Sequence, residues 1–231
     1  MKKIVKHMQS ATLFAGTAIL MMACGGQEST TEETTAVTTE ETTTDVDAEA
    51  PMNTGMEGSG MMGHMHRNME EMRSMRSKMI GDPDYDFAQM MTHHHQGAIR
   101  MAEEELNSGT DSKMKEMAQK IKASNQADIQ KLQDFTGKYK PTPGDTATTM
   151  KMMHPMNAMM GEMHKRDMSG MNTDQNFAQM MIHHHQMGNE MSKEFMKVGK
   201  TQEMKQLAQK TIDSQTKEIK ELEAWQQQNQ K

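Results

Sequence analysis

Apolar side chains recur at every third or fourth position from about residue 60 onward, the spacing that places them on one face of an α-helix. The first such stripe is built from methionine and ends at Gly81: Met62, Met65, Met69, Met72, Met75 and Met79. Asp82 followed by Pro83 predicts the N-cap and first turn of a second helix, which runs to about Ser108. The pattern predicts a third helix over 111–135.

The same helical pattern occurs twice in the chain. Residues 86–96 (DFAQMMTHHHQ) and 176–186 (NFAQMMIHHHQ) lie ninety positions apart, and this offset relates their flanks without a gap over about seventy positions. A linker with proline and glycine, 138–149, separates the repeats 59–137 and 150–231. No segment shows the alternation typical of a strand. We therefore predict an all-α helical bundle of two tandem repeats, about three helices each, with antiparallel neighbours.

Residues 1–23 differ from the rest and resemble a bacterial lipoprotein signal. Lysines come first, an apolar run too short to span a bilayer follows, and Cys24 comes next. We expect Cys24 to be lipidated, so that the protein is anchored to a membrane of the bacterial envelope and faces the periplasm or the exterior. Residues 24–58 are rich in threonine and glutamate without apolar periodicity, which predicts a disordered tether.

Composition adds a question about methionine. Hydrophobic residues make up 34% and aromatic residues 3% of the chain, while methionine contributes 33 residues. Methionine is a flexible core filler, but its thioether is also a soft metal ligand, and both interpretations stay open. The single cysteine excludes a disulfide within the chain and a multi-cysteine metal site. The net charge of −6 argues against nucleic acid as a partner.

Histidine and methionine share one face of the duplicated helix. Helical spacing places His94 and His95 beside the apolar seam and His93 on the outer flank, and the same holds for the second copy with His183 as its outward histidine. Two further histidines, His64 and His154, occupy related places in the methionine-rich segments. The candidate metal ligands are His93, His94, His95, Met90, Met91, Met101, His183, His184, His185, Met180, Met181, Met191, His64 and His154.

The third helix of each repeat has polar residues on its apolar face: Asn125 and Asp128 in the first, Gln215 and Glu218 in the second. Polar groups in an apolar seam need partners, and the facing histidines are the simplest ones. In one interpretation, His94 with Asp128 and His184 with Glu218 form buried hydrogen-bonded pairs that set helix register. In the other, the four polar residues orient imidazoles that bind a metal.

The donor set favours copper. Thioethers select Cu(I) and imidazole suits Cu(I) and Cu(II), so Cu(I) is favoured, Cu(II) is compatible, and silver is a soft mimic. Zinc gains little from methionine, and the Glu-x-x-His pairs of di-iron bundles and the HExxH motif do not occur in the sequence. No arrangement of nucleophile and base stands out, so we expect a protein that is not an enzyme.

The motif Phe-x-x-x-Met-x-x-His-His-Gln-x-Ala-x-x-Met-Ala, from Phe87 to Ala102, resembles the domain-of-unknown-function family 305. The resemblance extends to His184, His185 and Gln186 and spans both repeats. It implies a ferritin-like helical fold and copper binding in the periplasm or outside the cell, linked to copper resistance. The chain departs from the family where His93 and His183 replace a frequent proline and where Asn125 and Asp128 replace Gln and Glu.

These features predict an envelope protein that sequesters copper or transfers it to an exporter or acceptor protein. The alternative is a structural or partner-docking helical module with a methionine-rich core and hydrogen-bonded histidines. A copper enzyme of unknown reaction is a third hypothesis.

Overall fold

A computed structural model describes residues 60–156, 168 and 170–229 of the chain. Every regular element in these residues is helical, which confirms the predicted all-α, ferritin-like bundle. The predicted signal peptide, the lipidated Cys24 and the tether lie outside the described residues. None of the described helices combines the length and the apolar character needed to cross a membrane.

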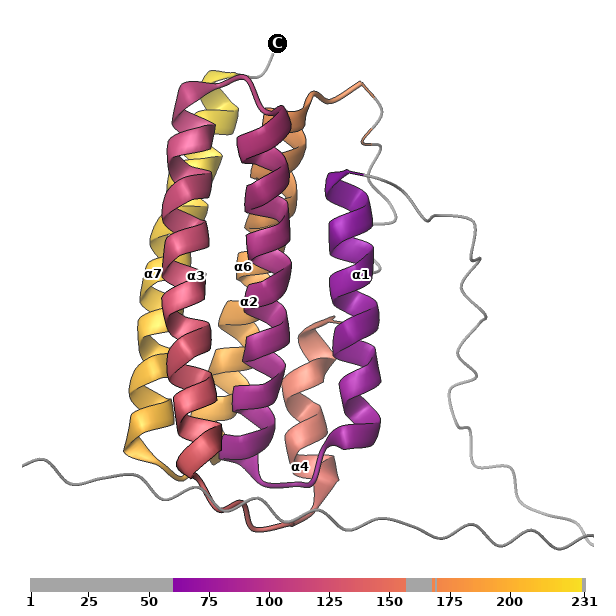
Figure 1. Ribbon diagram of the computed structural model, residues 1–231, viewed down its shortest axis with the longest axis vertical. Coiled ribbons are helices and arrows are strands. Elements are labelled where there is room, and N and C mark those ends of the chain that lie inside the picture. The colour runs from indigo at the N-terminus through magenta and orange to yellow at the C-terminus, as the bar shows by residue number, and fades with distance from the viewer. Residues whose placement is uncertain (1–59, 157–167, 169, 230–231) are drawn as a thin grey trace, which may run out of the picture. The chain divides into compact units, whose positions relative to one another are not determined.

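Four long helices form the bundle: α2 (Pro83–Ser108), α3 (Ser112–Lys138), α6 (Thr173–Val198) and α7 (Gln202–Gln228). Helix α2 packs on α3 and α6 packs on α7, so each repeat contributes one antiparallel pair. The two pairs lie face to face, with α2 against α6 (Figure 1). The predicted start of α2 is confirmed, because the Asp82 carboxylate accepts hydrogen bonds from the Asp84 and Tyr85 N–H groups.

Shorter helices flank one side of the bundle, namely α1 (Met61–Ser74), η1 (Met75–Lys78), α4 (Thr146–Met150) and η2 (Lys151–Met153). Helices α1 and α4 both contact α2 (Figure 1). The methionine stripe was expected to be one helix through Met79, but the helix tightens into η1 and Met79 is extended. Helix α4 starts inside the expected linker, because Asp145 caps it by accepting from the Ala147 N–H.

Two buried carboxylates join the repeats reciprocally. Asp84 of α2 accepts hydrogen bonds from the N–H groups of Lys200 and Thr201, which connect α6 to α7, at 2.8 Å each. At the other end of the bundle Asp174 of α6 accepts from the N–H groups of residues 110–111, which connect α2 to α3, at 2.9 and 2.8 Å. Each repeat therefore closes the helix connection of the other.

The two repeats share one core. Its upper cluster packs Met65, Met69 and Met101 against Phe177, Met180 and Trp225, and its lower cluster packs Met72, Met90 and Met91 against Met187, Met191 and Phe195. In the lower cluster the rings of Phe87 and Phe195 stack with centroids 4.0 Å apart. Methionine thus supplies most of the apolar filling, which is one of the two roles that its abundance left open.

Candidate metal centre

Four histidines meet where α2 crosses α6, between the two apolar clusters. His94, His95, His184 and His185 are each at most 2% exposed, and we call them the histidine layer. The rings of His94 and His184 lie face to face with centroids 3.8 Å apart. His94 Nε2 lies 3.0 Å from the carbonyl oxygen of His184, close enough for a hydrogen bond. The seam position expected for all four residues is confirmed.

A glycine makes room for this arrangement. A Cβ atom on Gly188 would lie 2.6 Å from Cε1 of His94 and 2.6 Å from Oε1 of Gln215, both far inside van der Waals contact. The related position in α2 is Ala98, so the exchange of alanine for glycine between the repeats has a packing reason. The His94 ring occupies the space that a side chain at position 188 would fill.

Ring nitrogens in the histidine layer lack partners. Among the described residues no hydrogen bond reaches Nδ1 of His94, or either ring nitrogen of His95 or His184. Burial lowers the pKa of His94 and His184 well below the usual value, with a further lowering from neighbouring histidines. Burial likewise lowers the pKa of His95 to about 4. The imidazoles of His94, His95 and His184 are therefore neutral at neutral pH and carry lone pairs that a metal ion can take.

The acids expected beside the histidines behave differently in the two repeats. Glu218 Oε2 lies 2.8 Å from Nε2 of His185, so this acid meets His185 and not the expected His184. Asp128, predicted to pair with His94, instead accepts from Lys210 Nζ at 2.6 Å and from Lys131 Nζ at 2.9 Å. Asp128 pairs with the two lysines because a charged donor binds a carboxylate more strongly than a neutral imidazole does.

The two amides are also close to the layer. Asn125 donates from Nδ2 to the Ile121 carbonyl at 2.8 Å, a bond within its own helix, which leaves Oδ1 without a partner among the described residues. Gln215 is 3% exposed, and its Oε1 faces Gly188 without a hydrogen bond from the described part of the chain. Asn125 opposes the fall in the pKa of His95, but no hydrogen bond from Gln215 in the described residues reaches a ring nitrogen of the layer.

Each apolar cluster contains candidate methionines from both repeats, because their height along the bundle decides which of them meet. Because α2 and α6 are antiparallel, Met101 joins Met180 and Met181 in the upper cluster, whereas Met191 joins Met90 and Met91 in the lower one. All six are at most 1% exposed. Thioethers therefore lie above and below the four imidazoles. No group of three or more His, Cys, Asp or Glu side chains in the described residues is arranged to hold a metal.

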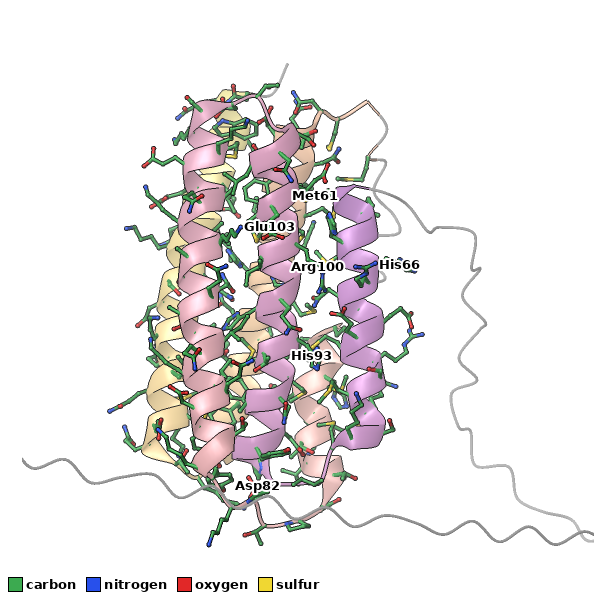
Figure 2. All side chains as sticks on the ribbon, viewed as in Figure 1. Met61, His66, Asp82, His93, Arg100 and Glu103 are labelled. Atoms are coloured by element: carbon green, nitrogen blue, oxygen red, sulfur yellow. The ribbon has the colours of Figure 1, made fainter. Side chains whose placement is uncertain are left out.

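The remaining candidates lie apart from the layer. His64 on α1 approaches Glu104 at 3.7 Å, and Glu104 is ten residues beyond His94, which is about 15 Å along an α-helix. His154 is exposed. His93 lies on the side of α2 next to α1 (Figure 2), where Asn68 Nδ2 donates to its carbonyl oxygen at 2.8 Å.

His183 corrects the sequence interpretation. It was expected to point outward like His93, but it is 6% exposed and its Nε2 lies 2.7 Å from Nε2 of Gln179. The reason is tertiary: α6 contacts α1, α2, α7 and η2, so few of its positions face solvent. Sequence reasoning also missed the role of Lys210, which comes from the other repeat and could not be placed by helical spacing.

These observations define a class, the duplicated helical bundle with a layer of buried histidines between methionine clusters. The chain belongs to the family of the domain of unknown function 305 (DUF305), whose model matches residues 19–136 and 136–226. No curated protein matches the sequence.

The chain is also similar to solved structures. CopM in a silver-bound form is 29% identical, with a TM-score of 0.50 over 64% of this chain and 97% of that chain. CopM in the apo form is 28% identical, with a TM-score of 0.50 over 64% of this chain and 98% of that chain. A DUF305 fragment from Deinococcus radiodurans is 21% identical, with a TM-score of 0.46 over 62% and 93% of the two chains.

Proposed function

We propose that the protein binds copper as Cu(I), with silver as a mimic, in the histidine layer and its flanking methionines, and that it sequesters the ion or transfers it. One observation carries the proposal. His94, His95, His184 and His185 are buried and lack partners at several ring nitrogens within the described residues. Burying a polar group without a partner costs about 1–3 kcal/mol. A metal ion that takes these lone pairs removes the penalty.

The choice of metal follows from the donors. Neutral imidazole nitrogens lie between thioether sulfurs, which is a soft set that prefers Cu(I) and Ag(I) to zinc, calcium or magnesium. The silver-bound structure of CopM, which is 29% identical to this chain, supports a site for soft metals. The neutral rings of His94, His95 and His184 are ready to bind because they carry no extra proton that the metal must displace.

The alternative is a purely structural role for the histidines as register-setting pairs. The contact between Glu218 and His185 at 2.8 Å is a pair of that kind. The opposite carboxylate, Asp128, is held by lysines instead, so the pairing is not repeated in the related half. We therefore favour metal binding over a structural module.

The proposal also includes the place of the protein in the cell and the partner that receives its copper. A lipid anchor at Cys24 would hold the domain at the envelope, and a copper exporter or acceptor would receive the ion. No reaction is assigned, and the protein acts as a carrier or store. Counting copper on the protein isolated from copper-fed cells tests the loading, and comparing its membrane and soluble fractions with and without substitution of Cys24 tests the anchor.

The central experiment is a titration of the purified protein with Cu(I) and Ag(I) against a competing chelator under reducing conditions. We expect His94→Gln with His184→Gln to weaken binding by at least about tenfold, or about 1.4 kcal/mol. The matched control is His64→Gln with His154→Gln, which removes two histidines outside the layer. Binding no tighter than millimolar in the wild type, or equal losses in both double variants, would refute the proposal.

A further inference from the structure

The two carboxylates that face the histidine layer occupy related positions but different surroundings. Asp128 of α3 and Glu218 of α7 stand ninety positions apart, each where α3 and α7 meet. The side chain of Asp128 is 5% exposed, and both of its oxygens accept from Lys210 Nζ, at 2.6 and 2.9 Å. Lys131 adds a third contact at 2.9 Å. Two positive charges therefore neutralise Asp128, and this carboxylate is not free to attract a cation.

Glu218 has no lysine bound to its carboxylate within the described residues. Its side chain is 21% exposed, and its polar contact within the described residues is with Nε2 of the fully buried His185. The positions related to Lys131 and Lys210 hold Glu221 and Lys120. Lys120 turns outward to Glu116, with Nζ to Oε1 at 2.6 Å, and leaves Glu218 alone. Glu218 therefore joins the solvent directly to a buried imidazole.

A surface groove leads to this point. It has a volume of about 290 Å³, and the residues that line it are Met117, Lys120, Ile121, Ser214, Lys217, Glu218 and Glu221. Met117 is 4% exposed, so a thioether belongs to the wall next to the carboxylate. The groove wall thus combines two carboxylates, two lysines and a thioether, and the imidazole of His185 lies behind Glu218.

We propose that soft monovalent cations reach the histidine layer through this groove between α3 and α7, with Glu218 as the gating residue. The proposal rests on the proposed function and adds its access route. Lys120 and Lys217 of the groove wall pair with Glu116 and Glu221, whereas no lysine in the described residues contacts Glu218. The carboxylate of Glu218 therefore attracts the cation. When Glu218 swings away from His185, Nε2 of that ring becomes available, and the ion passes from oxygen to nitrogen with Met117 alongside. Asp128 is held by two lysines and does not contact a ring nitrogen of the described histidines, so loading proceeds from the Glu218 side.

The first test measures the rate of Ag(I) loading by stopped flow with the full protein. Ser214→Phe fills the groove, and Ser124→Phe is its control at the related position of α3. We expect the Ser214 variant to load at least about tenfold more slowly with unchanged affinity, and the control to load within about twofold of the wild type. Equal rates in both variants would overturn the route.

Glu218→Gln, which is nearly isosteric, keeps the test decisive if phenylalanine at position 214 prevents folding. We expect it to slow loading about tenfold and to flatten the dependence of the rate on ionic strength. Glu223→Gln is the matched control, because it removes the same charge from an exposed position of the same helix outside the groove, and it should leave the rate within about twofold of the wild type. A faster or unchanged rate in Glu218→Gln would contradict the gating role.

A second measurement needs no metal. In the metal-free protein, diethyl pyrocarbonate should modify His185 faster than His95, and Ser214→Phe should protect His185. Equal modification of the two histidines would overturn the route. A wild type that takes up no silver would overturn the proposed function and the route together. Silver uptake that neither Ser214→Phe nor Glu218→Gln slows would overturn the route alone.

Discussion

Replacing Glu105 with glutamine should stabilise the protein at alkaline pH and remove one part of its pH dependence. Glu105 is fully buried near the end of α2, and as an ionised group it finds no hydrogen-bond donor in the described residues. Burial, together with the neighbouring carboxyl of Asp174, raises the pKa of Glu105 to about 8. When protonated, Glu105 can donate to Asp174, whose oxygens already hold the N–H groups of residues 110–111.

The size and sign follow from proton linkage. The folded-state pKa of Glu105 is raised above the ordinary value of 4.5, so the folded protein keeps a proton that the unfolded chain has lost. Stability is therefore lost as pH rises from about 4.5 to about 8, by about 1.4 kcal/mol per pH unit and about 5 kcal/mol in all. Glutamine avoids this loss but buries an amide with imperfect partners, which costs about 1–3 kcal/mol. The expected net gain near pH 8 is about 2–4 kcal/mol.

Urea unfolding followed by circular dichroism at several pH values between about 4.5 and about 8 measures this difference. Subtracting the wild-type free energy of unfolding from that of Glu105→Gln cancels other titrating groups, including the histidine layer. The gain should grow with pH and vanish or reverse near pH 4.5. Glu104→Gln is the control, because Glu104 is partly exposed one position away. A pH-independent difference, or a gain of the same size in the control, would refute the reasoning.

Three further predictions concern the histidine layer and the repeat contacts. Gly188→Ala should lower the free energy of unfolding by about 1–3 kcal/mol, because its Cβ would lie 2.6 Å from the His94 ring. The control Gly137→Ala, whose Cβ would have nothing within 4 Å, should not destabilise the protein. Equal shifts of the melting temperature in the two variants would contradict this prediction. Asp84→Ala should cost about 3 kcal/mol in urea unfolding, since two backbone N–H groups lose a carboxylate; a loss below about 0.5 kcal/mol would count against it. Silver binding should persist on acidification to about pH 5 and weaken near the His95 pKa of about 4, because protonation removes the lone pair of a ring nitrogen. Loss of silver binding already near pH 6.5 would contradict the lowered pKa of His95.

The helices and their limits could be read from local patterns. Asp82 and Pro83 begin α2 as predicted, and α2 ends at Ser108 as predicted, because capping and proline geometry act within one turn of the chain. The methionine-rich first helix was harder to delimit, because methionine spacing persists to Met79 while the backbone turns into η1 after Ser74. Side-chain periodicity reports a buried face and does not report where the backbone tightens.

The candidate site was predictable in part. The spacing of His94 and His95 placed them at the seam, since a buried face depends on local periodicity alone. The pairing of Asp128 with Lys210 and the burial of His183 were not predictable, because both depend on helices from the other repeat or from far along the chain. Helical spacing within one element carries no information about those neighbours.

The sequence by itself determined an all-α duplicated bundle, its family, and a seam in which histidines lie beside methionines. Only the tertiary structure decided that both repeats share one core, that the four histidines form a single layer, and that methionines from different repeats gather above and below it. The physical reason is the antiparallel packing of α2 on α6. Two identical local patterns fix which side chains are buried, whereas the direction in which the helices pack decides which of them meet.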